Sequence, residues 1–312
     1  PTDGDQEKPA PGASIGSKGD GKVSPVTLPV GSVSLNNQDA NPSEFGTSEI
    51  PFTTSRLNPD GVELSRAYPF RASGKLFFNI GGGSYVCSAS LIGRGLVVTA
   101  AHCVIGYGTG SFYSNFKFVP AYENGLAPFG VWDVSNVAVM SSYAYGYDSC
   151  AVPGIVCAND VAVMAIRPMR SNYPGNNTGW LGYGWNGYGF NNQSEAQFSQ
   201  LGYPVSHDAG ARMQRTDSMA VVDGGMSNNS VWGSRQTGGS SGGPEVVNLG
   251  TPSVLSGGVQ PGYEATFNTV VGVTSWGHVN KVVKAQGASP FTSGNIVPLT
   301  NYMCSYAPAA CM

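Results

Sequence analysis

The chain has 312 residues, including 44 glycines and 21 prolines, and only 11% of its residues are charged, for a net charge of -3. So weak a charge gives no electrostatic argument for nucleic acid or an anionic membrane as a partner. No apolar run approaches the ~20 residues of a membrane-spanning helix. We therefore expect a soluble, turn-rich β protein with one large domain and an extension.

The first part of the chain has a composition of its own. Residues 1–66 are rich in glycine, proline, serine and aspartate and contain no cysteine, tryptophan or histidine. Such a segment would be disordered if left alone, so we predict that part of it lies along a folded domain, anchored by residues 50–52. It is either a pro-segment that covers a cleft or an export remnant or linker, and the sequence leaves both interpretations open.

From about residue 67 onward, the chain is a series of short strand-like runs. A hairpin is predicted around the glycines at 81–83, between the runs 75–78 and 85–91. Helix signals are few: one short turn is predicted after residue 102 and another near the C-terminus. Further strands are predicted at 96–100, 116–119, 136–140, 161–166, 201–204, 219–222, 244–248, 270–275 and 296–299.

The sequence GGSSGGP at residues 238–244 is the most unusual stretch. Glycine costs roughly 1 kcal/mol in a helix or strand interior, but it allows a tight turn whose successive N–H groups point to one side and bind an anion. Such donors stabilise charge that develops on a carbonyl oxygen. Ser241 is therefore a candidate nucleophile, with its own N–H and that of Gly239 as donors. The alternative is a surface linker.

A serine becomes a good nucleophile only when a base takes its proton. His102 ends an apolar, strand-like run and precedes a cysteine, whereas His207 and His278 lie in loop-like settings. A buried carboxylate that orients the imidazole is the expected third member, and Asp160 opens another apolar run. Taken singly, these two residues could equally be a core histidine bonded to the backbone and a turn-capping aspartate.

Six cysteines, an even number, suggest disulfides and an oxidising compartment. Six cysteines allow 15 pairings, which the sequence alone leaves open. No group of cysteine and histidine has zinc-ligand spacing, so we expect no metal site. No signal peptide is visible, as expected if one has been removed from a secreted protein.

Together, these motifs resemble the catalytic blocks of the chymotrypsin/trypsin-like serine endopeptidases. The histidine, aspartate and serine blocks follow that family's order, and two further blocks flank them. Five ordered blocks are far more specific than one motif, and other segments are most similar to the bacterial glutamyl-endopeptidase (V8-like) branch. The blocks are 87–92, 99–103, 160–163, 239–244 and 275–277, and the branch segments are 68–70, 202–204 and 237–241.

The resemblance implies an all-β fold of two six-stranded antiparallel β-barrels with an N-terminal extension. The extension is residues 1–66, and the protease domain is 67–312, with the first barrel at about 67–175 and the second at about 176–312. Residues 180–184 fit the strand that links the barrels, although the aromatic residues around them also suit a sugar or a peptide. The implied disulfide is Cys87–Cys103, and the simplest completion is Cys150–Cys157 and Cys304–Cys311.

By the same resemblance, the chain is a secreted or periplasmic serine endopeptidase that cleaves proteins or peptides through an acyl-enzyme. His102 is the base, Asp160 orients it, Ser241 attacks, and the amides of Gly239 and Ser241 hold the oxyanion. The resemblance implies no cofactor, nucleic acid or membrane, and we expect a monomer. The implied substrate-binding residues are Arg235, Gln236, Thr237, Ser275, Trp276 and Gly277.

Two positions depart from the trypsin pattern. Ser240 replaces the aspartate that pairs with a newly freed N-terminus, so we predict that this ion pair is not the activity switch. Arg235, six residues before Ser241, favours an acidic substrate side chain if it faces inward, but the specificity stays undetermined beyond that lean. Two alternatives remain open: a non-catalytic binding protein on the same fold, and a narrow-target toxin or esterase.

Overall fold

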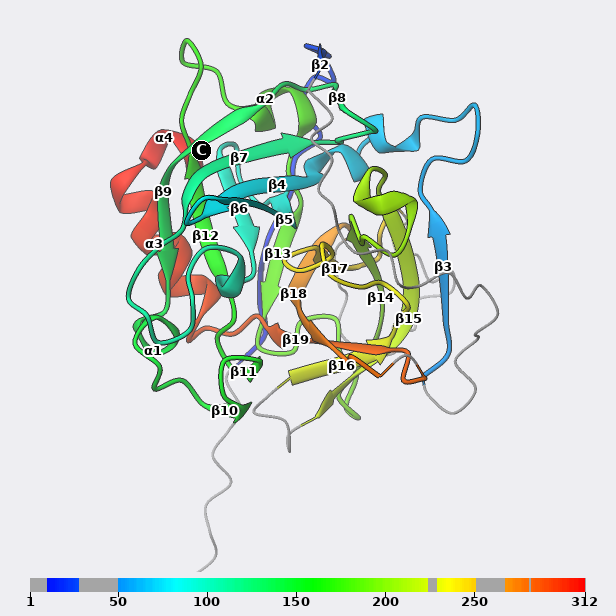
Figure 1. Cartoon of the computed structure of the whole chain (residues 1–312), viewed down its shortest axis with the longest axis vertical. Helices are drawn as coiled ribbons and strands as arrows, with labels where there is room; N and C mark the ends of the chain where they lie inside the picture. Colours follow the sequence, from blue (N-terminus) through cyan, green and yellow to red (C-terminus); the bar gives the residue numbers. More distant parts are fainter. Residues whose placement is uncertain (1–9, 28–49, 224–228, 251–266, 281, 312) are drawn as a thin grey trace, which may run out of the picture.

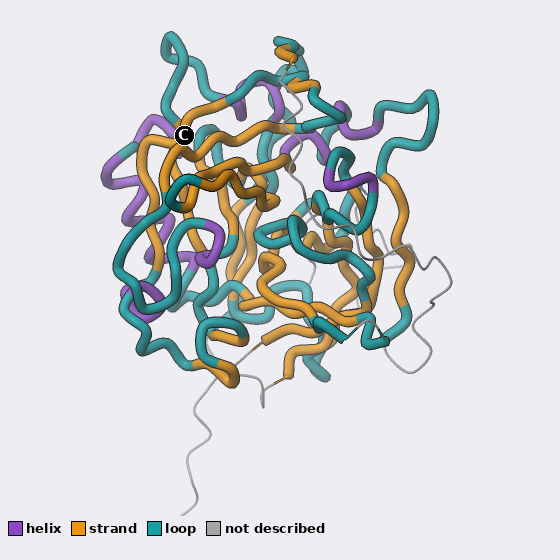
Figure 2. The backbone as a smooth tube through the Cα atoms, in the orientation of Figure 1, coloured by secondary structure: helices purple, strands orange, loops and turns teal. Residues whose placement is uncertain are grey.

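Two antiparallel barrels make up most of the molecule, and they lie next to each other in the cartoon and in the backbone tube (Figure 1, Figure 2). The computed structural model describes residues 10–27, 50–223, 229–250, 267–280 and 282–311. In the part of the chain that it describes, no helix is long and apolar enough to cross a membrane. The predicted fold class, two six-stranded antiparallel barrels, is confirmed.

The first barrel closes in the order β12-β6-β5-β4-β7-β9. Strand β12, with the sequence AVMAI, is buried at every residue and pairs with β6 on one side and β9 on the other. Strands β4 and β5 form the predicted hairpin. The strands are β4 (Ser73–Ile80), β5 (Gly83–Leu91), β6 (Leu96–Thr99), β7 (Ser114–Pro120), β9 (Trp132–Val139) and β12 (Ala162–Ile166).

The second barrel closes through the pairings β18-β17-β14-β15-β16-β19 and a final pairing of β19 with β18. Strands β16 and β19 were not predicted from the sequence. Strand β19 (AQGASP) is built of small and polar residues and has no apolar alternation. All six of its residues are nevertheless buried. The strands are β14 (Glu195–Gly202), β15 (Gln214–Asp223), β16 (Asn229–Gly233), β17 (Pro244–Val247), β18 (Thr269–Gly277) and β19 (Ala285–Pro290).

The N-terminal extension contributes strands to the sheets, as predicted. Strand β3 (Phe52–Arg56) pairs with β15, so the anchor near residues 50–52 is confirmed. Strand β1 (Gly12–Ser14) pairs with β13 (Gly182–Trp185), which runs parallel to β18 and contains most of the predicted linking segment. Two small ladders complete the sheets: β2 (Val26–Thr27) with β8 (Leu126–Ala127), and β10 (Cys150–Val152) with β11 (Val156–Cys157).

The strand predicted at 296–299 is wrong, because these residues begin helix α3 (Ile296–Tyr306). The Asn295 side chain caps the helix by accepting a hydrogen bond from the Ile296 N–H. Buried residues recur with helical spacing at Ile296, Leu299, Thr300 and Met303. The strand was predicted from the apolar run at 296–299 alone, and so short a run does not distinguish a helix from a strand. Although α3 follows the second barrel in the chain, it packs on β12 and β9 of the first (Figure 1).

The remaining helices are short. One of them, a single turn directly after β6, carries residue 102 and matches the turn predicted there. The α-helices are α1 (Ser141–Ala144), α2 (Pro174–Thr178) and α4 (Pro308–Cys311), and the 3-10 turns are η1 (Leu64–Arg66), η2 (Phe70–Ala72), η3 (Ala101–Cys103) and η4 (Asp208–Gly210).

Candidate active site

His102 lies in the turn η3, where the buried strand β6 ends. The next residue, Cys103, forms a disulfide with Cys87 of β5, which ties this turn to the neighbouring strand. The imidazole side chain keeps 31% of its surface exposed, so one edge of the ring remains open to a reactant. The other two disulfides, Cys150–Cys157 and Cys304–Cys311, also match the expected pairs.

Asp160 lies two residues before the start of β12 and is almost completely buried. Its Oδ2 lies 2.7 Å from His102 Nδ1, and its Oδ1 accepts a hydrogen bond of 2.8 Å from the His102 backbone N–H. The Ser275 hydroxyl, on β18 of the second barrel, also donates to Oδ2. The carboxylate is therefore held in one orientation by donors from both barrels.

The electrostatics of this pair favour charge on both partners. Burial disfavours the Asp160 carboxylate, but the neighbouring imidazole and the donated hydrogen bonds outweigh burial and leave the pKa of Asp160 below its usual value. Burial likewise disfavours the imidazolium, but the charge and hydrogen bond of Asp160 raise the pKa of His102 above 6.5. A proton accepted by this ring is thus stabilised by the aspartate behind it.

Ser241 lies in the glycine turn that enters β17, and the turn packs against the histidine strand. The Ser241 carbonyl accepts a hydrogen bond of 2.7 Å from the Ser88 N–H on β5. Gly242 has φ +77°, and a Cβ on it would lie 1.9 Å from Thr99 Oγ1, so only glycine allows this approach. Within the described residues, the Ser241 hydroxyl makes no hydrogen bond to His102. Such contacts are often long in an apo enzyme and close on substrate.

The predicted oxyanion donors lie in the same turn. Gly239 has φ +96°, a backbone conformation that glycine adopts without strain. Neither the Gly239 N–H nor the Ser241 N–H donates a hydrogen bond to any part of the chain that the structure describes. Both amides therefore remain available for an incoming oxygen.

The predicted substrate-binding residues fall into two segments. Arg235 is half-buried, Thr237 is exposed, and Gln236 is buried with its Nε2 3.1 Å from Thr216 Oγ1. In the second segment, Ser275 contacts Asp160, as described, and the Trp276 indole N–H donates to Asn229 Oδ1 at 2.7 Å. Gly277 is exposed at the end of β18. Gln236 and Trp276 thus support the site from within the barrel.

Strand β18 offers a free edge beside Ser241. Its pairing with β17 ends at Val273, whereas its pairing with β19 continues to Gly277. The glycine turn makes hydrogen bonds to β18 only as far as Thr274: the Gly242 N–H donates to the Thr274 carbonyl, and the Thr274 N–H donates to the Gly243 carbonyl. The edge of residues 275–277 that faces the turn therefore has no strand partner among the described residues.

Three residues that support this site were not predicted from the sequence: Ser289, Ser88 and Gln286. The Ser289 hydroxyl accepts a hydrogen bond of 3.0 Å from the Asp160 N–H and donates to the Cys157 carbonyl. Ser88 lies within the block 87–92 that resembles the protease family, and this position could have identified it from the sequence. Ser289 and Gln286 lie on the unrecognised strand β19 and gave no such signal.

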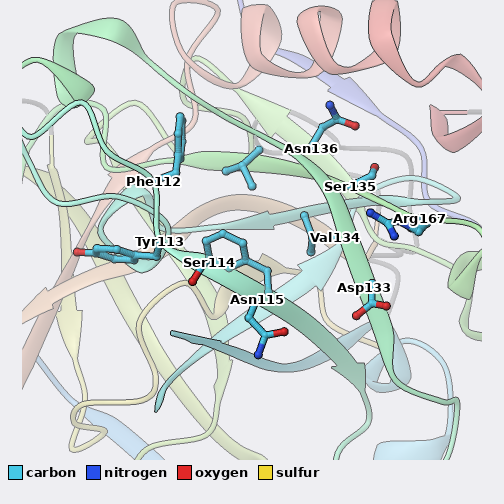
Figure 3. A pocket seen from close by; sticks show the side chains of 11 residues that line it. Phe112, Tyr113, Ser114, Asn115, Asp133, Val134, Ser135, Asn136 and Arg167 are labelled. Carbon is cyan, nitrogen blue, oxygen red and sulfur yellow. The ribbon is translucent and has the colours of Figure 1, made fainter. Parts of the chain in front are cut away.

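A polar groove of about 540 Å³ lies on the first barrel, away from these residues. It is lined by residues 112–116, residues 133–137 of β9 and Arg167 (Figure 3). None of the predicted site residues line it. The candidate site is therefore not this groove but the seam between the two barrels.

Among known proteins, the chain is similar in fold to several solved protease structures. No family model and no curated protein matches the chain. The thermostable serine protease AL20 from an extremophilic microorganism has 24% identity and a TM-score of 0.58, over 75% of this chain and 97% of its own. The protease Anisep from Arthrobacter nicotinovorans has 25% identity and a TM-score of 0.54, over 77% and 95%.

A third solved structure, a Glu endopeptidase in complex with MPD, has 17% identity and a TM-score of 0.54, over 81% of this chain and 96% of its own. At these identities the likeness establishes the architecture. The resemblance to chymotrypsin/trypsin-like serine proteases is thus confirmed at the level of the fold.

Proposed function

We propose that the chain is a serine endopeptidase that cleaves peptide bonds through an acyl-enzyme. The observation that carries this proposal is the pair of His102 and the buried Asp160, held by Ser275 and placed against the glycine turn of Ser241. A histidine with a raised pKa, an ionised orienting carboxylate and a neighbouring serine are the three parts that nucleophilic acyl transfer requires. The protease fold adds to this argument.

In the proposed mechanism, His102 removes the proton of Ser241 as its hydroxyl oxygen attacks the substrate carbonyl. The amides of Gly239 and Ser241 stabilise the oxyanion, and Asp160 stabilises the imidazolium. His102 then protonates the leaving amine, and the acyl-enzyme forms as the peptide bond breaks. A water molecule, activated by the same imidazole, attacks the ester and releases the acid.

The free edge of residues 275–277 suits an extended substrate. A peptide that pairs with this edge gains backbone hydrogen bonds that do not depend on its sequence. The edge continues directly from Thr274, which forms hydrogen bonds with the turn that contains Ser241. A peptide that pairs with the edge would therefore lie beside Ser241. We propose that this edge is the main-chain binding site of the substrate.

One basic side chain supports a preference for acidic substrates. Arg235 is half-buried near the start of the serine turn. We propose that its positive charge favours a glutamate or aspartate before the scissile bond. A panel of chromogenic peptides tests this, and fastest cleavage after arginine or phenylalanine contradicts it.

The proposed function is tested by labelling with a fluorophosphonate, which reacts with an activated serine. We expect about one label per chain on Ser241, together with cleavage of casein. The Ser241→Ala variant is the matched control and should take up no label. A wild-type chain that binds peptides but takes up no label would instead be a binding protein, and one that hydrolyses only small esters would be an esterase.

The compartment and the extension remain proposals as well. Three disulfides support a secreted or periplasmic protein. We propose that the described part of the extension near residues 52–57 braces the protease domain 67–312, because β3 pairs with β15 and Leu57 is buried. A chain that begins at Asn58 should have a free energy of unfolding about 2 kcal/mol or more below that of a chain that begins at Ile50. Higher kcat in the chain from Ile50 than in the full chain would instead indicate inhibition by the extension.

A further inference from the structure

Ser240, the residue before the nucleophile, is buried and held from two sides. Its hydroxyl donates a hydrogen bond of 2.7 Å to the Thr237 carbonyl, which closes the turn. The same hydroxyl accepts a hydrogen bond of 3.2 Å from Gln286 Nε2 on β19. A neutral amide from the barrel interior therefore contacts the position where trypsin-like enzymes carry a charged aspartate.

The Gln286 amide is itself fixed by buried neighbours. Its Oε1 accepts a hydrogen bond of 2.7 Å from Gln200 Nε2 and lies 2.9 Å from Ser234 Oγ. Gln200 also donates at 2.9 Å to Thr274 Oγ1. Because the oxygen of Gln286 faces these donors, its amide nitrogen faces Ser240. A buried polar network whose members are satisfied holds a single arrangement.

A second set of contacts fixes the backbone on both sides of Gly239. The Ser88 hydroxyl donates a hydrogen bond of 2.8 Å to the Gly239 carbonyl and accepts one of 2.9 Å from the Tyr203 N–H. The Val205 N–H donates at 2.8 Å to the Gly238 carbonyl. With both carbonyls held, the two peptide planes that meet at Gly239 are fixed, and so is the direction of its N–H.

We propose that Gln286 and Ser88 are positioning residues that hold the oxyanion turn, residues 238–241, in its active conformation. This inference rests on the serine endopeptidase function proposed above. Donors that are oriented before charge develops require no reorganisation during the reaction. The neutral network takes the place of an ion pair, so the turn is in place without any newly formed N-terminus.

The test compares Gln286→Leu, which keeps the volume but loses the donor, with Ser88→Ala. Each variant should lower kcat about 10- to 100-fold, less than the loss of an oxyanion donor itself, with KM within about threefold. The acid limb of the pH profile should stay in place, because the His102–Asp160 pair is untouched. Ser88→Thr keeps the hydroxyl and should restore most of kcat.

Thr300→Val is the matched control, because it removes a buried hydroxyl that bonds only within α3. Wild-type kcat in both Gln286→Leu and Ser88→Ala, or a loss equal to that of the control, overturns the inference. If Gln286→Leu does not fold, Ser88→Ala and its threonine rescue decide. If the wild type cleaves no peptide, the proposed function fails. Crystal structures of the variants then still test whether Gln286 and Ser88 position the turn. A rotated Gly238–Gly239 peptide supports the positioning role, and an unchanged one overturns it.

Discussion

Asp160 and Glu245 are two carboxyl groups that are each only 1% exposed, one beside the first barrel and one inside the second. Burial raises the pKa of both, yet the final directions are opposite. His102, Ser275 and a backbone N–H bring the pKa of Asp160 below its usual value. The pKa of Glu245 stays well above 4.5, because the nearby Ser230 hydroxyl lowers it by less than burial raises it.

The local packing explains this difference. Glu245 lies opposite Gly272 on β18, where a Cβ would come within 2.6 Å of its Oε2, so the carboxyl fills the space that the glycine leaves. Its Oε1 has no hydrogen-bond partner among the described residues. Equal burial thus gives a lowered pKa where donors converge and a raised pKa where they do not. Four predictions test this comparison.

The largest effect is expected from His102→Ala, which removes both the base and the cationic partner of Asp160. We expect kcat for a peptide substrate to fall by about 10⁶. The pKa of Asp160 should rise, as in Glu245, and carboxyl NMR titration measures this. Ser241→Ala is the control, because it should lose as much activity while the pKa of Asp160 stays low. A loss below tenfold in His102→Ala would exclude the proposed base.

A smaller loss is expected from Asp160→Asn, which keeps the shape but removes the charge. We expect kcat to fall by about 10⁴, because the amide no longer stabilises the imidazolium or fixes the ring's tautomer. Glu245→Gln is the matched carboxyl-to-amide change and should leave kcat unchanged. Equal losses in the two variants would mean that the activity does not depend on the charge of Asp160.

The pH profile should carry the signature of the raised His102 pKa. The base must be neutral to accept a proton, so kcat/KM should fall about tenfold per pH unit below the pKa of the ring. Since Asp160 raises that pKa above 6.5, the acid limb should lie above pH 6.5 in the wild type. In Asp160→Asn the limb should move to lower pH, and an unmoved limb would contradict the assignment.

The smallest effect concerns stability and comes from Glu245. The pKa of Glu245 in the folded state lies above the usual 4.5. Between pH 4.5 and that raised pKa, the folded state therefore holds one proton more than the unfolded state. Stability should therefore fall as pH rises through this window, by up to about 1.4 kcal/mol per pH unit. Glu245→Gln should abolish that slope in denaturant titrations, and an unchanged slope would mean that Glu245 is ionised.

The two-barrel architecture was expected from the resemblance to a known family. The sequence by itself indicated a β protein, most of the barrel strands and the order of the histidine, aspartate and serine blocks. Those features depend on local signals: apolar runs such as 161–166, glycines where the backbone turns tightly, and a histidine or aspartate at the end of such a run. It also located the anchor of the extension near Phe52. These signals are readable because each depends on neighbours in the chain.

Only the tertiary structure decided the helix at 296–306, the strand β19 and the support of the site by Ser88, Gln286 and Ser289. The residues of β19 are small and polar, and they become a strand because the ring of the second barrel closes on them. Gln286 meets Ser240 across 46 positions of the chain. Contacts at such separations depend on which strands pair, and no local pattern in the sequence records that choice.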